Sequence, residues 1–352
     1  MEKNEKSRRG RKKKNELKQD NSVPDLRLTG TSTLYDAQSG EPILVWEKTA
    51  AQNQKEIFEA AAQAFAQKIK PIRPIKLDKR RLDADLLCTY PVGDHHIGML
   101  ALAEETGGED YNIEIAQELL LKSFAHLLGL SNAGHCLIPF LGDFLHFDGM
   151  KPLTPTSDNL LDTGTRFHVM VRTAIRCMRT IIESAARVHE TVHVIVAAGN
   201  HDLAASIFLR ECLANLYDNN PRIIVDTSPS HFHYHAFGKS LIGVHHGHGT
   251  KAKLKDLPLI MAVDCPDWSR CEHRYCYTGH VHSDNVFDIQ GCRVESFRIL
   301  APGDAWATNS GYRSARDMKS ILLHHEFGEV ARHTVNPALL QGSGSGEPKT
   351  LM

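Results

Sequence analysis

The feature that most constrains how this chain of 352 residues can fold is a repeated pattern, in which an apolar run is followed by a short polar motif. Each apolar run has the length of a buried strand, and each motif places Asp, Asn or His beside a Gly or at the end of the run. The motifs are Asp94-His95-His96, Gly142-Asp143, Gly199-Asn200-His201-Asp202, His245-His246-Gly247-His248 and Gly279-His280-Val281-His282. Because sites in α/β proteins gather beyond the carboxyl ends of strands, we expect the five motifs to converge.

Strand and helix patterns alternate around these motifs. Helical spacing predicts helices at 112–130, 165–189 and 204–217. Strands are predicted at 86–92, 136–141, 192–198, 222–225, 232–237, 241–244, 285–289 and 320–325, with another ending at 279. Helices alternate with strands first, and strands predominate after residue 221. This order favours the α/β class, as a four-layer αββα sandwich of two mixed β-sheets flanked by helices.

The flanks of the chain differ from this main domain, which we expect to span 81–340. Residues 1–24 are basic and lack apolar periodicity, so they are predicted to be a disordered arm that either aids solubility or attracts nucleic-acid phosphates. Residues 25–80 are predicted to form a small appendage, with a hairpin from 31–35 and 43–46 followed by a helix at 50–69. The Gly- and Ser-rich residues 341–352 resemble a flexible tail or an expression scar.

Composition limits the functional classes. A hydrophobic content of 41% with 24% charged residues supports a packed core, and the net charge of −1 gives no global attraction to nucleic acid. The eight cysteines lie mostly in apolar runs without a signal peptide, which predicts reduced thiols in a cytoplasmic protein. Cys265, Cys271, His273 and Cys276 match no standard zinc-finger spacing, so we favour buried thiols over a zinc site there. The chain contains no apolar run of the roughly 20 residues that a membrane helix needs.

The donor types in the five motifs predict a metal centre. Two Asp, one Asn and several His suit Mn, Fe, Zn or Ni better than Ca or Mg. Seven donors exceed what one tetrahedral ion takes, but they suit two ions that share a carboxylate at a separation of roughly 3.5–4 Å. We therefore expect two divalent cations, with Mn favoured and Fe, Zn, Ni or Mg as alternatives.

The order of the motifs between residues 94 and 282 resembles that of the calcineurin-like metallophosphoesterases. The resemblance implies that Asp94, His96 and His282 bind the first metal, and that Asp143 bridges the two ions. It also implies that Asn200, His246 and His280 bind the second metal, with His245 and His248 as alternatives to His246. By the same resemblance His201 contacts the phosphate or protonates the leaving group.

The second motif continues to His146, and a His at this position is similar to the SbcD-like DNA-repair exonucleases. The resemblance implies that His146 helps to orient the phosphate, whereas the plainer alternative is a polar His beside the site. Members of that branch carry a C-terminal capping region and a segment that binds an ATPase, and only a short β-rich stretch follows His282 here. We therefore expect a stand-alone enzyme of the phage or bacterial type without an obligate ATPase partner, and we leave a homo-oligomer open.

The leading functional hypothesis is a DNA phosphodiesterase of the exonuclease type, in which a metal-bridging hydroxide attacks phosphorus in line. Arg166 and Lys251 are the basic residues most expected to contact the nucleic acid, although solvated surface is the common fate of such side chains. One alternative is a phosphoesterase acting on cyclic nucleotides or nucleotides, and another is a non-catalytic nucleic-acid-binding scaffold.

Overall fold

The computed structural model describes residues 26–35, 42–51, 63, 69–79, 81–155, 157–248 and 254–340. Contacts divide the chain into two compact units, Met1–Ile57 and Phe58–Met352. In the first unit, β1 (Leu26–Tyr35) and β2 (Pro42–Ala51) pair antiparallel, which is the predicted hairpin. The arm at 1–24, most of the helix predicted at 50–69 and the tail at 341–352 lie outside the described residues.

The second unit contains a mixed sheet of six strands in the order β13-β12-β3-β4-β5-β6. Its parallel strands are β3 (Asp83–Thr89), β4 (Ala133–Phe140), β5 (Thr191–Val196) and β6 (Ile223–Val225). The strand β12 (Met318–His324) runs antiparallel to both β3 and β13 (Gly328–Val335). The carboxyl ends of β3, β4 and β5 therefore lie at one edge of the layer.

A second mixed sheet of five strands has the order β10-β11-β9-β8-β7. Its parallel strands are β8 (Ser240–Val244), β9 (His273–Thr278) and β11 (Cys292–Ser296), and its antiparallel edges are β7 (His233–Phe237) and β10 (Asn285–Ile289). Buried side chains of both sheets form one apolar cluster, in which Leu137 and Ile195 of the first sheet join Ile242 and Tyr277 of the second. The two sheets therefore pack face to face.

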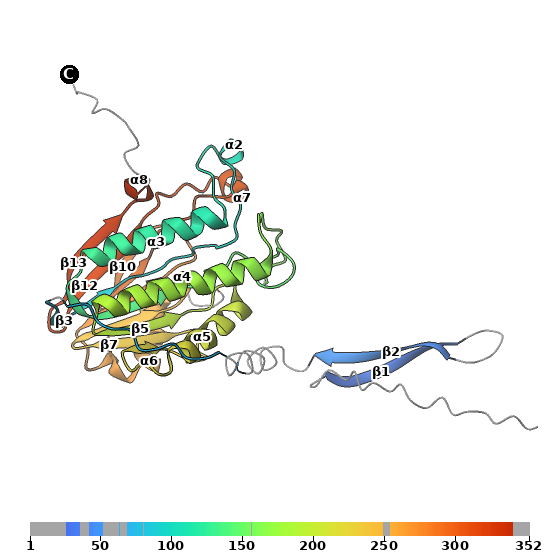
Figure 1. The fold of residues 1–352 in the computed structure, drawn as a ribbon, viewed down its shortest axis with the longest axis horizontal. Helices are drawn as coiled ribbons and strands as arrows, with labels where there is room; N and C mark the ends of the chain where they lie inside the picture. Colours follow the sequence, from blue (N-terminus) through green and yellow to red (C-terminus); the bar gives the residue numbers. More distant parts are fainter. Residues whose placement is uncertain are drawn as a thin grey trace, which may run out of the picture. The chain divides into compact units, whose positions relative to one another are not determined.

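Helices cover the outer faces of both sheets, which confirms the predicted four-layer sandwich. The helices α3 (Ile113–Gly129), α4 (Phe167–Val188) and α5 (Leu203–Tyr217) share an apolar core with β3, β4 and β5. α3 and α4 run side by side in Figure 1. On the other side, Met261 of α6 (Leu257–Asp264) packs with buried residues of the five-stranded sheet.

The described residues also contain shorter helical segments. They are α2 (Ala103–Thr106), α7 (Ala305–Asn309), α8 (Pro337–Leu340) and the 3₁₀ turns η1 (Leu254–Asp256) and η2 (Pro266–Trp268). In the part of the chain that the structure describes, none of the helices has both the length and the apolarity needed to cross a bilayer.

Local sequence explains the best-predicted helix, α3. The Asn112 side chain accepts a hydrogen bond from the Ile115 backbone N at 2.9 Å, which caps the amino end of the helix. The buried positions recur every three or four residues, as one apolar face requires. The eight cysteines are all free and buried, and Cys265, Cys271 and Cys276 lie in the apolar cluster under α6. The His273 Nε2 lies 2.9 Å from the Glu326 carbonyl oxygen, so this ring is engaged away from the thiols.

Candidate metal centre

The five polar motifs follow β3, β4, β5, β8 and β9, and the structure brings them together at the carboxyl ends of these strands. Among the described residues, two of the resulting groups each offer one carboxylate and two imidazoles, and a third consists of three imidazoles, those of His96, His146 and His201. The first group is Asp94, His96 and His282, and the second is Asp143, His246 and His280. Within each group the ligand atoms lie within 4.8 Å of one another. The convergence that we expected from the sequence is therefore present.

The first group surrounds a fully buried carboxylate. The His282 Nε2 lies 2.9 Å from the Asp94 Oδ2 and 3.3 Å from the His96 Nε2. The His280 backbone N donates to both carboxylate oxygens of Asp94, at 3.0 and 2.8 Å. Because His280 belongs to the second group, this hydrogen bond also makes the two groups neighbours. A buried carboxylate needs such donors or a cation to offset the loss of water.

In the second group the backbone fixes the orientation of the His246 ring. The His246 Nδ1 donates to the Leu141 carbonyl oxygen at 2.8 Å. Its Nε2 therefore faces the other way, 3.2 Å from the Asp143 Oδ2 and 3.0 Å from the Asn200 Oδ1. A backbone acceptor that orients an imidazole in this way is the usual support of a metal-binding His. The same contacts bring Asn200 to the second group.

The charges in the second group favour a cation between the side chains. Burial lowers the pKa of His246, but the carboxylates of Asp143 and Asp94 outweigh this effect and raise that pKa to about 10. Burial alone would raise the pKa of Asp143, yet His246 and His201 hold it well below its usual value. Two oxygens and an imidazole nitrogen that face one another fit a divalent cation, because the cation satisfies all three donors at once.

The backbone at the ligand positions is strained. Among the described residues, six non-glycine residues have a positive φ, and four of them belong to the two groups: His96 at 47°, Asp143 at 48°, His280 at 67° and His282 at 53°. A non-glycine residue in this region costs about 1–3 kcal/mol, and such residues cluster at functional sites. The strain therefore supports a functional role for these positions.

Two glycines make room for the carboxylates. A Cβ atom on Gly199 would lie 2.0 Å from the Asp143 Oδ1, and one on Gly279 would lie 2.1 Å from the Asp94 Oδ1. No side chain fits at these distances, so both motifs require glycine here.

Asp202 is a supporting residue whose role we did not predict from the sequence. Its buried carboxylate accepts hydrogen bonds from the backbone N of Gly199, Asp143, Phe144 and Leu145, at 3.0, 3.2, 2.8 and 3.2 Å. These bonds fix the turn that presents Asp143. The only sequence signal was its place as the last residue of the motif at 199–202.

The predicted catalytic histidines lie beside the first group. The His201 Nδ1 donates to the His146 carbonyl oxygen at 2.7 Å, and the two rings stack with centroids 5.6 Å apart. The His146 ring is only 2% exposed, and its Nδ1 lies 3.4 Å from the Nδ1 of His96. His146 is thus packed against two site residues rather than lying on the surface.

The three candidate histidines of the fourth motif lie in different surroundings. His246 lies in the second group, whereas the His245 Nδ1 accepts a hydrogen bond from the Gly247 N at 2.9 Å and its ring stacks on Phe232. His248 is exposed, with its Nδ1 3.3 Å from the His280 Nε2. Of the basic residues, Arg166 is exposed immediately before α4, and Lys251 lies outside the described residues.

No protein-family model and no curated protein matches the sequence. Solved structures that match include a predicted phosphoesterase from Streptococcus pneumoniae TIGR4, at 10% identity and a TM-score of 0.30, covering 72% of this chain and 99% of that chain. Vps29 from Entamoeba histolytica in complex with zinc matches at 11% identity and a TM-score of 0.30, covering 71% and 99%. A putative 5'-nucleotidase from Staphylococcus aureus in complex with alpha-ketoglutarate matches at 11% identity and a TM-score of 0.33, covering 71% and 54%. Similarity at TM-scores this low says nothing about activity. An activity for this chain has to be inferred from the geometry of its own residues.

Proposed function

We propose that this chain is a calcineurin-like metallophosphoesterase, which binds two divalent cations and hydrolyses phosphoester bonds. The observation that supports this most strongly is the pair of adjacent groups, each with one carboxylate and two imidazoles from different strand ends. The order of the motifs along the chain and the two-sheet sandwich agree with the same family resemblance. Because strained backbone and close glycine contacts occur at these positions, we regard the arrangement as built for ligands.

Asp94, His96 and His282 would hold the first ion, and Asn200, His246 and His280 the second, with Asp143 shared between them. When bound, the two ions activate water and neutralise charge on the phosphoryl oxygens. A donor set of imidazoles, carboxylates and one amide suits Mn, Fe, Zn or Ni, and we favour Mn.

The chain's own residues would position the substrate and move the proton. His201 is partly exposed, and its Nδ1–H donates to the His146 carbonyl oxygen, so proton exchange is left to its Nε2. We propose that the imidazolium form of the ring gives its Nε2 proton to the leaving oxygen and becomes the neutral ring that keeps the Nδ1 proton. His146 is buried against His96 and His201, so we propose that it acts by orienting these two rings rather than by touching the substrate.

The substrate we propose is a phosphodiester in DNA, cleaved from an end. The placement of His146 within the site favours this choice, because a His at that position is similar to the exonuclease branch of the family. Arg166 and Lys251 are proposed to contact phosphates of the strand. The second candidate is a nucleotide or cyclic nucleotide, which the same two groups of ligands could accommodate. A non-catalytic scaffold is less favoured, because every ligand position of the motifs is filled.

The test is to incubate the purified protein alone, without ATP, with Mn²⁺ and end-labelled single- and double-stranded DNA. Parallel reactions contain bis-p-nitrophenyl phosphate and a cyclic nucleotide, and EDTA and Asp143→Asn serve as controls. Cleavage of DNA from one end that both controls abolish is the expected result. Hydrolysis of the small substrates with intact DNA would refute the nuclease, and inertness toward every ester with every metal would refute the phosphoesterase.

A further inference from the structure

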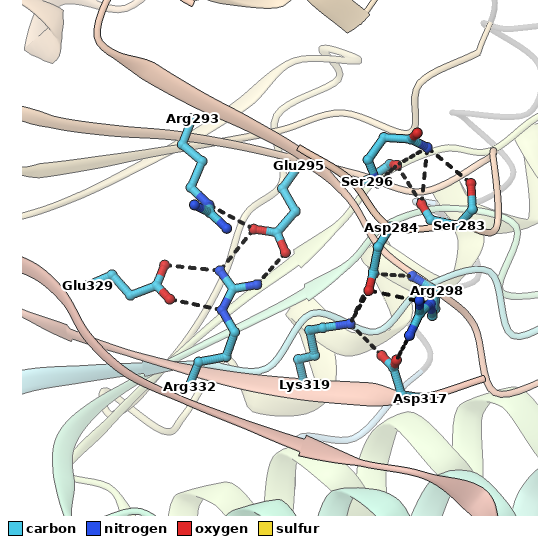
Figure 2. Close-up of polar contacts among 11 residues, drawn as sticks. Ser283, Asp284, Arg293, Glu295, Ser296, Arg298, Asp317, Lys319, Glu329 and Arg332 are labelled. Atoms are coloured by element: carbon cyan, nitrogen blue, oxygen red, sulfur yellow. Dashed lines mark hydrogen bonds and ion pairs between the residues drawn. The ribbon is translucent and has the colours of Figure 1, made fainter. Parts of the chain in front are cut away.

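The loop that carries His282 is held by a closed ring of four charged side chains, which we call the charge ring. Its members are Asp284, Arg298, Asp317 and Lys319. The Lys319 Nζ lies 3.0 Å from the Asp284 Oδ1 and 2.5 Å from the Asp317 Oδ1. The Arg298 guanidinium lies 3.0 Å from the other oxygen of Asp317 and 3.4 Å from Asp284. Figure 2 shows the ring, in which each charge contacts two opposite ones.

The charge ring joins the two sheets at one edge of the sandwich. Asp317 immediately precedes β12 of the six-stranded sheet, and Lys319 lies within that strand. Asp284 immediately precedes β10 and Arg298 follows β11, both in the five-stranded sheet. The Lys319 and Asp317 side chains are only 8% and 5% exposed, so the ions depend on one another for compensation.

The charge ring also contacts both loops that present the first ligand group. On one side, Asp284 is two residues after His282, and the intervening Ser283 accepts a hydrogen bond through its carbonyl oxygen from the Ser296 Oγ at 2.7 Å. On the other side, the Arg298 carbonyl oxygen would lie 3.1 Å from a Cβ atom on Gly93, which directly precedes Asp94. Asp284 thus lies in the loop that carries His282, and Arg298 lies beside the residue that precedes Asp94.

We propose that Asp284 and Lys319 are positioning residues that hold His282 against Asp94 and thereby set the affinity of the first metal site. His282 needs such support, because its φ of 53° is unfavourable for a non-glycine residue and its side chain is 38% exposed. The charge ring supplies the fixed anchor just beyond this residue. The inference rests on the proposed function, since it concerns the same metal centre.

A second charged cluster in the same region provides a matched control. Arg332 of β13 pairs with Glu295 of β11 and with Glu329 of β13, and Arg293 pairs with Glu295. This cluster also joins the two sheets, and the Glu295 side chain is 2% exposed. In the part of the chain that the structure describes, its side chains pair with one another and with no residue of the loops at 93–96 and 279–284 (Figure 2).

The experiment compares Asp284→Asn with Glu329→Gln, because both replace a carboxylate by an amide in a network between the sheets. The metal-free proteins are titrated with Mn²⁺ by calorimetry and with Co²⁺ by visible absorption, and their thermal unfolding is recorded without metal. We expect Asp284→Asn to weaken one of two binding events at least tenfold, and Glu329→Gln to leave both within twofold of wild type. A second variant, Asp284→Asn with Lys319→Met, leaves the Arg298–Asp317 pair balanced, so it should regain thermal stability without regaining metal affinity.

The possible outcomes separate a failure of the positioning inference from a failure of the proposed function. If wild type binds two ions and Asp284→Asn binds both with unchanged affinity, the positioning inference is wrong and the proposed function stands. If the double variant regains metal affinity together with stability, the effect was general destabilisation and the inference is again overturned. If wild type binds no divalent ion, the proposed function fails first and the inference fails with it.

Discussion

Replacement of Asp202 tests whether the turn presenting Asp143 is held as the structure shows. The Asp202 Oδ1 accepts from the Gly199 and Asp143 N, and the Oδ2 accepts from the Phe144 and Leu145 N. Asp202→Asn keeps one oxygen but turns an NH₂ group toward two backbone donors. Two hydrogen bonds to the carboxylate are lost, each worth about 1.5–3 kcal/mol when the carboxylate is ionised. Because burial and the neighbouring Asp143 raise the pKa of Asp202 to about 7, we expect a loss of about 3–6 kcal/mol in the free energy of unfolding at a pH above that value.

That loss is large beside the roughly 5–15 kcal/mol that stabilises a typical domain. The assay is equilibrium urea denaturation of metal-free wild type and Asp202→Asn, followed by calorimetric titration of each with Mn²⁺. We expect the variant to be destabilised. We also expect it to bind metal more weakly, because the Asp202 carboxylate fixes the turn that contains Asp143.

The matched control for this substitution is Asp148→Asn. The Asp148 carboxylate also accepts two backbone hydrogen bonds, from Ala204 N at 2.5 Å and Ala205 N at 3.0 Å, but these donors belong to the first turn of α5. The control should lose some stability and keep its metal affinity. Wild-type stability in Asp202→Asn, or equal losses of metal affinity in both variants, would refute the reasoning.

Three further predictions address the site and the core. Gly279→Ala should abolish metal binding at the first group while the far-ultraviolet circular dichroism is kept, because the added Cβ would lie 2.1 Å from the Asp94 Oδ1; calorimetry that still finds two sites would contradict this. Mn²⁺ at a hundredfold excess over its Kd should raise the free energy of unfolding by about 2.7 kcal/mol per site, and EDTA should reverse this, as urea titrations would show. The native thiols should resist Ellman's reagent until urea is added, since all eight are buried and burial raises the pKa of Cys88 to about 11; rapid reaction of native protein would count against the core packing described.

The predicted strands and long helices agree with the structure because their signals are local. The helix predicted at 112–130 is α3, with Asn112 as its cap, and the strand predicted at 285–289 is β10. The helix α6 was missed, because the eight residues Leu257–Asp264 give too short a periodic pattern. Residue types and spacing also indicated that the five motifs would meet at the strand ends, since parallel strands end at one edge of a sheet, whereas the roles of the individual side chains were implied by the family resemblance.

The burial of charged side chains that pair with residues far away in the sequence could not be predicted. Glu295 is a charged residue and by its type is expected at the surface, yet its side chain is 2% exposed because Arg332 from the other sheet neutralises it. Lys319 is buried for the same reason, through Asp284 and Asp317. A pattern of apolar and polar residues records whether each side chain prefers water, but not whether a partner of opposite charge will meet it.

The choice among His245, His246 and His248 shows the same limit at the centre of the site. Every residue of the preceding strand, β8, is buried, so alternation between faces gives no register that could be continued into the motif. The Leu141 carbonyl oxygen orients the His246 ring, because it accepts a hydrogen bond from the Nδ1 and turns the Nε2 toward Asp143. That carbonyl oxygen belongs to the segment after β4, in the other sheet, so the orientation of the His246 ring depends on the two sheets packing together. The candidate metal centre is therefore a property of the sandwich, and mutations that shift one sheet against the other should weaken metal binding without altering any ligand.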